Sequence, residues 1–446
     1  MVKRANGSKM YLENINKPAQ DIILTNGRII DPENKMDQSA DIVLSDGVIK
    51  EIGTDLHTKY PNALTKDVSG MWVVPGLMDM HVHLREPGRE DKETIATGTQ
   101  AAAAGGFTSV ACMPNTTPVL DEESKIRYVI QRGEACPCKI HPVGAITKNL
   151  DGEELAPFGE MVNSGARAVS DDGKAVAKSN IMRNALNYSK SFDIPVICHS
   201  EDSTLSYKGH MNEGLVSTRL GVRGVPVIAE DIGVMRDLLL AEYTGARIHV
   251  AHVSTAGAVR LIRAAKKRGV RVTVETCPHY ITLTDEDVGL YDTNKKMNPP
   301  LRTALDRDAV IEGLCDGTID VIASDHAPHN SEEKDVEFDA AAFGVVGLET
   351  SLGVVITALV KKGLLTPSQM VEKMALNPNK ILSLTGGNLS TGAAADLTVI
   401  DPELKWHVDP QSFYSKSKNT AFDGMELQGA AVMTVLDGRI VYERSS

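Results

Sequence analysis

The sequence predicts an α/β protein: a (β/α)8 TIM barrel joined to a small β-sandwich domain that both termini build together. Two observations carry this prediction. Short β-branched runs alternate with helical stretches rich in Ala, Glu and Lys through the middle of the chain, and hairpin signals recur at its two ends. The length of 446 residues suits a barrel of about 250 residues plus a smaller domain.

The two ends of the chain share a strand–turn–strand pattern. Apolar runs lead into Asn26-Gly27 and Asp46-Gly47 near the N-terminus and into Asp437-Gly438 near the C-terminus, and residues 395–401 look like a further strand. Asn-Gly and Asp-Gly favour tight hairpin turns because both central residues of such a turn need positive φ. We therefore expect one composite β domain over residues 21–74 and 387–446, preceded by a polar leader over residues 1–20.

Between these ends, residues 75–386 carry eight strand candidates with helical stretches between them. Strands are expected at 76–83, 107–113, 140–146, 166–171, 194–199, 248–253, 272–276 and 321–325, and helices at 93–104, 181–190, 229–242 and 255–267 among others. Eight β/α units in this length predict a closed barrel. An open doubly wound sheet is the alternative, but no Gly-x-Gly-x-x-Gly motif follows the first strand to favour it.

The composition excludes several classes of protein. Lysine plus arginine total 47 and aspartate plus glutamate total 59, a net charge of −12, so the long-range field repels nucleic acid and anionic membranes. Six cysteines in a chain this long make no disulfide framework, and no apolar run reaches the length of a membrane span. We therefore expect a cytoplasmic protein with free thiols.

Five of the eight expected strand ends deliver a histidine or an aspartate. The first strand ends in His81-Val82-His83, and the two imidazoles face one side because alternate residues of a strand do so. The other ends carry Asp171-Asp172, His199, His252 and Asp325. Barrels keep their active sites at the rim formed by the carboxyl ends of their strands, and histidines with carboxylates suit divalent metal ions. An aspartate after a strand can also be a helix cap, but the five strand ends together favour a metal site.

Several motifs resemble the amidohydrolase superfamily and, within it, the dihydroorotases of the bacterial class I type. The likeness covers nearly the whole chain. The motifs are His81-Val82-His83-Leu84-Arg85-Glu86-Pro87-Gly88, Met113-Pro114-Asn115-Thr116, Asp171-Asp172-Gly173, Lys296-Met297-Asn298-Pro299-Pro300-Leu301-Arg302, Asp325-His326-Ala327-Pro328-His329 and the closing Gly392-Ala393-Ala394-Ala395-Asp396-Leu397.

The resemblance implies two Zn²⁺ ions per subunit, other divalent ions also being compatible with these ligands. His81 and His83 would hold one ion with Asp325 beside it, His199 and His252 would hold the second, and Asp172 would bridge them, with Asp171 as the alternative bridge. The implied activity is the reversible cyclisation of N-carbamoyl-L-aspartate to L-dihydroorotate in de novo pyrimidine (UMP) biosynthesis. In the hydrolytic direction a metal-bridging hydroxide would be the nucleophile and Asp325 the general acid/base.

The family also implies a set of substrate contacts and partners. The expected substrate-binding residues are His83, Arg85, Asn115, Asn298, His329, Phe343 and Gly344. The planar guanidinium of Arg85 suits a substrate carboxylate, although Arg85 could instead pair with Glu86 at the surface. A homodimer is expected from the family. Two alternatives stay open: another cyclic-amide hydrolase such as an allantoinase or a hydantoinase, and a non-catalytic partner of aspartate transcarbamoylase.

Overall fold

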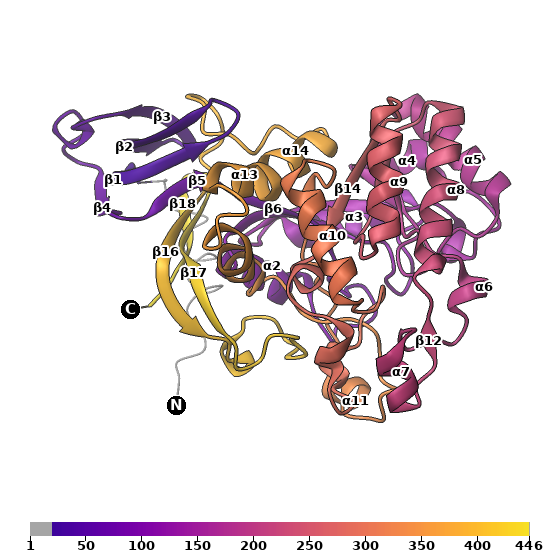
Figure 1. Cartoon of the computed structure of the whole chain (residues 1–446). Helices are drawn as coiled ribbons and strands as arrows, with labels where there is room; N and C mark the ends of the chain where they lie inside the picture. The colour runs from indigo at the N-terminus through magenta and orange to yellow at the C-terminus, as the bar shows by residue number, and fades with distance from the viewer. Residues whose placement is uncertain (1–19, 446) are drawn as a thin grey trace.

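A parallel barrel fills the centre of the molecule in the computed structural model, which describes residues 20–445 (Figure 1). Eight strands lie in the order β6-β7-β8-β9-β10-β13-β14-β15, and the His83 N–H donates to the carbonyl of His326, 2.8 Å away, to join the last strand to the first. The strands are β6 (Leu77–Val82), β7 (Phe107–Cys112), β8 (Lys139–Ala145), β9 (Ala168–Ser170), β10 (Val196–Cys198), β13 (Ile248–Val250), β14 (Val272–Thr276) and β15 (Val321–Ile322). The predicted barrel is confirmed, and each expected strand overlaps an observed one.

Helices surround the barrel and the loops at its carboxyl end. The α-helices are α2 (Ile95–Ala104), α3 (Glu123–Gly133), α4 (Phe158–Asn163), α5 (Ser179–Ser189), α6 (Ser203–Ser206), α7 (Leu215–Leu220), α8 (Ile228–Thr244), α9 (Ala256–Lys267), α10 (Ala304–Cys315), α11 (Ser331–Lys334), α12 (Ser351–Val355), α13 (Pro367–Val371) and α14 (Asn377–Ile381). Thr94 and Thr255 cap the first turns of α2 and α9 through their side-chain oxygens, which explains where these two helices begin.

Shorter elements connect these helices and strands. The 3-10 turns are η1 (Leu56–Thr58), η2 (Lys148–Leu150), η3 (Lys190–Phe192), η4 (Pro278–Ile281), η5 (Asp285–Val288), η6 (Thr293–Lys295) and η9 (Pro410–Ser412), and the π-helical segments are η7 (Ile356–Val360) and η8 (Glu372–Leu376). A two-stranded ribbon of β11 (Met211–Asn212) and β12 (Gly224–Val225) lies between β10 and α8. Among the described residues, no helix combines the length and apolar character needed to cross a membrane.

Strands from both ends of the described chain form one continuous sheet beside the barrel (Figure 1). Its order is β18-β17-β16-β5-β1-β2-β3, with β4 paired to β1, and its apolar side chains make a core of their own. The strands are β1 (Ile22–Asp31), β2 (Met36–Ser45), β3 (Val48–Gly53), β4 (Leu64–Asp67), β5 (Trp72–Pro75), β16 (Leu397–His407), β17 (Glu426–Leu436) and β18 (Arg439–Glu443). We call this the terminal sheet. The exact domain limits stay a prediction, and the leader lies almost wholly outside the described residues.

One expected turn in the terminal sheet is wrong. Asp46-Gly47 and Asp437-Gly438 do connect neighbouring antiparallel strands, but Asn26-Gly27 lies inside β1. The pairing of β1 with β2 shifts register between Leu24 and Gly27, and Asn26 has a φ of 62°. The dipeptide therefore makes a β-bulge, which uses the same positive φ without reversing the chain.

Candidate active site

Asp172 lies at the centre of the four histidines that the sequence predicts as metal ligands. Its carboxylate oxygens are 3.4 Å from His81 Nε2, 3.4 Å from His83 Nε2, 3.5 Å from His252 Nε2 and 3.6 Å from His199 Nδ1. These side chains come from the carboxyl ends of β6, β9, β10 and β13, and all of them are buried. Histidines from three strand ends thus surround one carboxylate from a fourth, as expected for a bridging ligand.

Asp325 completes the cluster from the end of β15. Its Oδ1 atom lies 3.2 Å from His83 Nε2 and 3.5 Å from His81 Nε2. On the other side of Asp172, the rings of His199 and His252 approach each other, with 2.9 Å between Nδ1 and Nε2. The six expected ligands therefore form one cluster around Asp172, in which His81 adjoins both His83 and His252.

The chemistry of this cluster fits divalent cations. Three of its atoms, His81 Nε2, Asp172 Oδ1 and His252 Nδ1, are buried without a hydrogen-bond partner among the described residues. Burial opposes ionisation of Asp172, but the adjoining histidines, His81 foremost, hold its pKa well below the ordinary value. The pKa of Asp325 is likewise lowered by His81 and His83 against the effect of burial. Both carboxylates stay anionic at neutral pH, and imidazole nitrogens with carboxylate oxygens are ligands that Zn²⁺ and similar ions accept.

The neighbouring Asp171 has a different role from Asp172. Its carboxylate accepts hydrogen bonds from the backbone N–H groups of Ile146 and Thr147, at 2.8 and 3.0 Å, and from the Thr147 hydroxyl. These bonds join β9 to the end of β8. Asp171 therefore holds the loop in place, and Asp172 is the aspartate that faces the histidines.

Three further carboxylates, which the sequence reasoning missed, hold the ligands in position. Glu275 on β14 is completely buried, with Oε1 2.5 Å from His81 Nδ1 and Oε2 3.1 Å from His249 Nε2. Asp79 accepts a hydrogen bond from the His81 N–H at 3.1 Å, and Glu201 lies 3.8 Å from His199 Nε2. The Glu275 and Glu201 contacts are of the kind that fixes the orientation of a metal-ligating imidazole, whereas Asp79 holds the backbone N–H of His81.

Two of these carboxylates could have been found from their positions in the sequence relative to the histidines. Asp79 lies two residues before His81, and Glu201 lies two residues after His199. Alternate residues of a strand face the same side, so the alternation that paired His81 with His83 also extends to Asp79. Glu275 has no such neighbour in sequence. Only the barrel brings it to His81.

Arg85 and His329 lie together beside the metal-ligand cluster. The Arg85 Nε–H donates to the carbonyl of Pro328 at 3.1 Å, and Nη2 lies 3.4 Å from His329 Nε2. Burial lowers the pKa of Arg85 to about 10, so its guanidinium stays cationic at neutral pH. Burial and the neighbouring Arg85 lower the pKa of His329 to about 3, which keeps that imidazole neutral. The pair offers one fixed positive charge next to a neutral hydrogen-bonding ring.

The remaining expected substrate contacts lie around the same end of the barrel. Asn115 Oδ1 lies 2.8 Å from His83 Nδ1, so this side chain orients the His83 imidazole. Asn298 donates to Glu201 at 3.1 Å and lies 3.3 Å from His199 Nε2. The carbonyl of Phe343 is 2.8 Å from His329 Nε2, and Gly344 follows it.

Gly344 is required by its surroundings. Its φ is +126°, and a Cβ atom there would lie 2.7 Å from the Cβ of Ala327 and 3.3 Å from His329 Nε2. A side chain at this position would therefore displace His329.

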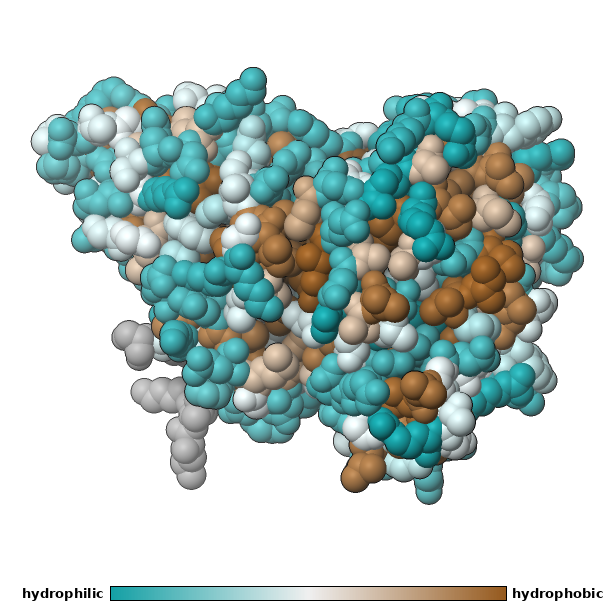
Figure 2. All heavy atoms as spheres, viewed as in Figure 1, coloured by the Kyte–Doolittle hydropathy of each residue, from teal (hydrophilic) through white to brown (hydrophobic). Residues whose placement is uncertain are grey.

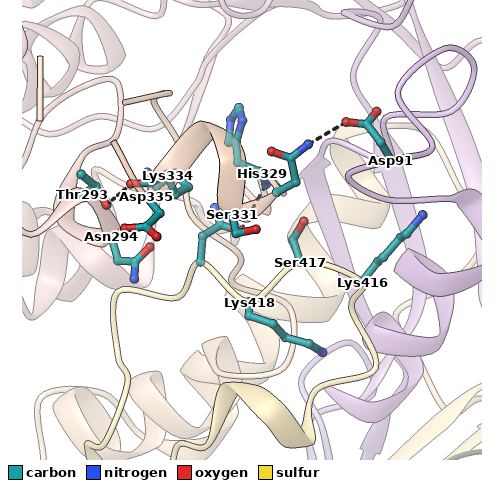
Figure 3. Close-up of a pocket in the computed structure, with 12 residues that line it drawn as sticks. Asp91, Thr293, Asn294, His329, Ser331, Lys334, Asp335, Lys416, Ser417 and Lys418 are labelled. Atoms are coloured by element: carbon teal, nitrogen blue, oxygen red, sulfur yellow. Dashed lines mark hydrogen bonds between the residues drawn. The ribbon is translucent and has the colours of Figure 1, made fainter. Parts of the chain in front are cut away.

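His329 also borders a cavity of about 480 Å³ that is lined in part by residues 416–419 (Figure 3). Lys334, Lys416 and Lys418 line this cavity, and the Asn330 amide donates to Asp91 at its edge, 2.8 Å away. Its lining contains none of the six metal-ligand candidates. The candidate chemistry therefore lies at the barrel rim and not in this cavity.

Comparisons with known proteins agree with this geometry. A family model described as dihydro-orotase-like matches residues 70–258. The dihydroorotase of Pelobacter propionicus is 55% identical over 424 residues, covering 95% of this chain and all of that protein. The dihydroorotase of Syntrophotalea carbinolica is 53% identical over 425 residues, with 95% of this chain and 99% of that protein covered.

Among solved structures, the L-hydantoinase (dihydropyrimidinase) of Arthrobacter aurescens superimposes with a TM-score of 0.86 at 27% sequence identity. The superposition covers 96% of this chain and 97% of the hydantoinase chain. A dihydropyrimidinase from Brevibacillus agri shares the fold, with a TM-score of 0.83 at 22% identity and 95% of each chain covered.

Barrel, terminal sheet and histidine–aspartate rim together define a cyclic amidohydrolase of the amidohydrolase superfamily, with a site suited to divalent metal. Within that superfamily, identity above 50% over nearly the whole length places the protein more narrowly. The chain belongs to the dihydroorotase family.

Proposed function

We propose that this protein catalyses the reversible cyclisation of N-carbamoyl-L-aspartate to L-dihydroorotate, a step of de novo pyrimidine (UMP) biosynthesis. The observation that carries the proposal is the position of Asp172, within 3.6 Å of a nitrogen of each of four histidines. Relatives named dihydroorotase match along nearly the whole chain and support the same activity.

Two Zn²⁺ ions per subunit are the proposed cofactors. His81, His83 and Asp325 would hold one ion, His199 and His252 the other, and Asp172 both. Bound ions of this kind supply a hydroxide nucleophile at neutral pH and polarise the carbonyl that is attacked. Metal analysis of active protein should give two ions per chain, and a count of one in fully active protein would contradict the Asp172 bridge.

Asp325 is the proposed general acid/base. Its lowered pKa leaves the carboxylate free to accept a proton at neutral pH. In the biosynthetic direction it would take the proton from the attacking ureido nitrogen. In the hydrolytic direction it would return that proton to the leaving amide nitrogen.

The substrate carboxylate is proposed to bind at Arg85, with Asn115 and His329 beside it. A buried guanidinium suits this task because its forked donors match a carboxylate and desolvation strengthens the pairing. Asn298 and the backbone of Phe343 and Gly344 are the proposed contacts of the ring, and His83 would meet both ion and substrate.

Hydantoin hydrolysis is the rival activity, because the superimposed solved structures are hydantoinases and dihydropyrimidinases. Dihydroorotate, hydantoin and allantoin should be assayed side by side with the metal-loaded protein. We expect turnover of dihydroorotate at least about 10-fold above the other two, since a paired buried charge contributes roughly 1.5–3 kcal/mol. Turnover of only hydantoin or allantoin would overturn the proposal.

A homodimer is the proposed assembly, and α8 offers a surface for it. Ile228, Met235, Leu239 and Tyr243 are 46%, 43%, 56% and 78% exposed and lie on one stripe, and Figure 2 shows apolar surface on this side of the barrel. A surface helix that is apolar on its outer face as well as its inner face is typical of one covered in an assembly.

A second copy fits this stripe by symmetry. Two α8 helices related by a two-fold axis would pack antiparallel, with opposed dipoles, over about 25 Å. A cavity of about 320 Å³ between α8 and α9, lined by Ile232, Met235 and Leu261, could take a side chain of the other copy. Met235→Glu with Leu239→Glu should give monomers in sedimentation, whereas Leu305→Glu, at an exposed position of α10, should not.

Cytoplasmic location and association with aspartate transcarbamoylase stay predictions.

A further inference from the structure

A second group of metal-ligating side chains adjoins Asp325. One ligand atom each of Cys277, His279 and Asp325 lie within 4.8 Å of one another, and all three side chains are buried. Cys277 directly follows β14, His279 lies in η4, and Asp325 follows β15, so two neighbouring barrel strands bring them together. Neither Cys277 nor His279 belongs to the ligand set described above.

These two side chains are available as ligands. His279 Nε2 is buried without a hydrogen-bond partner among the described residues, which is unusual for a polar atom in a protein interior. An imidazole nitrogen without a hydrogen-bond partner and a buried free thiol are both donors that a thiophilic divalent ion accepts.

The spacing of the group matches that of the catalytic cluster. In the catalytic cluster too, one ligand atom each of His81, His83 and Asp325 lie within 4.8 Å of one another. Tetrahedral Zn²⁺ with bonds of about 2.0–2.3 Å keeps its ligand atoms roughly 3.5 Å apart, so either group must close by up to about 1.3 Å around an ion. Cys277 and His279 thus lie within reach of one ion together with Asp325.

We propose that Cys277, His279 and Asp325 form an additional, inhibitory site for a thiophilic divalent ion such as Zn²⁺ or Cd²⁺. On binding, the Cys277 S–H bond breaks, an S–metal bond forms and the proton passes to solvent. The inhibition rests on the proposed role of Asp325. With one carboxylate oxygen on the catalytic ion and the other on this additional ion, Asp325 has no oxygen left to accept the substrate proton. Thiolate ligation favours Zn²⁺ and Cd²⁺ over Mg²⁺ and Mn²⁺, so the latter two should not inhibit in this way.

Cobalt substitution tests the site without relying on activity. The proposed catalytic ligands contain no sulfur, so a thiolate-to-Co²⁺ charge-transfer band can come only from a cysteine. Protein holding two Co²⁺ ions should lack the band and gain it with a third equivalent. Cys277→Ser and Cys277→Ala should abolish the band, and Cys138→Ser, at another buried free thiol, should keep it. Absence of the band in the wild type, or its persistence in both Cys277 variants, overturns the site.

Inhibition is measured separately on the metal-loaded enzyme. Excess Zn²⁺ should inhibit the wild type, and Cys277→Ser should need at least about a tenfold higher Zn²⁺ concentration for the same loss, at unchanged basal activity. Equal inhibition of both proteins would overturn the inhibitory role. If neither protein turns over dihydroorotate, the proposed function fails, while the cobalt band still decides the site. If both Cys277 variants fail to fold, His279→Gln is the second test: it should weaken the binding of the third Co²⁺ and its band, and an unchanged band contradicts the proposal.

Discussion

The barrel rim and the terminal sheet use the same unusual backbone conformation for different purposes. In the terminal sheet, positive φ falls on Asn26, Asp46 and Asp437, at 62°, 51° and 47°. At the rim it falls on Arg85, His252 and Asp325, at 61°, 35° and 49°. Asn and Asp in bulges and turns accept this conformation at low cost, whereas a bulky or buried residue there costs of order 1–3 kcal/mol.

The interiors of the two regions also differ: one is apolar and the other is polar. The core of the terminal sheet is apolar, with Ile23, Leu24 and Val73 completely buried. The rim buries imidazoles and carboxylates within 4 Å of one another. The apolar core of the terminal sheet therefore stabilises the fold, while the rim holds groups in positions that cost free energy. Changes at the rim should therefore affect function first, and changes in the terminal sheet should affect stability first.

Asp325→Asn should have the largest effect. The amide keeps the shape of the side chain and loses the basic oxygen, so kcat should fall by about 10²–10⁴-fold. Metal content and thermal unfolding should stay close to those of the wild type. Steady-state kinetics with metal analysis check this, and a largely intact kcat would remove Asp325 from proton transfer.

Glu275→Gln should come next, because Glu275 contacts His81 without being an expected ligand itself. Loss of this carboxylate should weaken metal binding by about 10–100-fold, measured by competition with a chelator. Glu349→Gln is the matched control, since that carboxylate accepts from the backbone N–H groups of Tyr414 and Ser415. Equal metal affinity in both variants would limit Glu275 to a packing role.

Arg85→Met should chiefly raise KM. Removing a buried charged partner of the substrate carboxylate costs about 1.5–3 kcal/mol, or about 10–100-fold in KM, with a smaller change in kcat. Arg89→Met on the same loop removes two ion pairs, with Asp91 and Glu333, of a side chain that is 40% exposed, so KM should change little. If the two variants have the same KM, Arg85 does not bind the carboxylate.

Gly27→Ala tests the terminal sheet. A Cβ atom at Gly27 would lie 2.7 Å from Val73 Cγ2 and 2.9 Å from Val68 Cγ2, so the free energy of unfolding should fall by about 1–3 kcal/mol. The kcat/KM of folded protein should stay within about twofold. Gly53→Ala, which meets Leu56 at an ordinary 3.4 Å, is the control for thermal unfolding. A loss of activity without a loss of stability would break the division between the two regions.

His141 on β8 should contribute the smallest effect, in acid. Burial, and then the nearby Arg167 and Lys139, lower its pKa to about 4, against about 6.5 when unfolded. The unfolded chain therefore binds the proton first, and this contribution to stability is lost as the pH falls from about 6.5 to about 4. His141→Asn should flatten the fall of melting temperature in that window. An unchanged profile would mean that other groups dominate.

Much of the fold and of the site could be predicted from the sequence because local patterns carry it. Each expected barrel strand is recognisable from a short apolar run. The ends of four of these strands carry His81, His83, His199, His252 and Asp325 to one rim. The Asn26-Gly27 turn was misjudged because the dipeptide specifies a positive φ but not whether the chain reverses or bulges. Register, which pairing with β2 decides, is not a local property.

By itself, the sequence determined the class of fold, the strand ends that bear ligands and the family, since periodicity and short motifs are written along the chain. Only the tertiary structure decided that Asp172 and not Asp171 faces the histidines, that Glu275 supports His81, and that Cys277 and His279 adjoin Asp325. The physical reason is that these contacts join different strands. Their distances depend on barrel closure and on the stagger between neighbouring strands, which no single segment encodes.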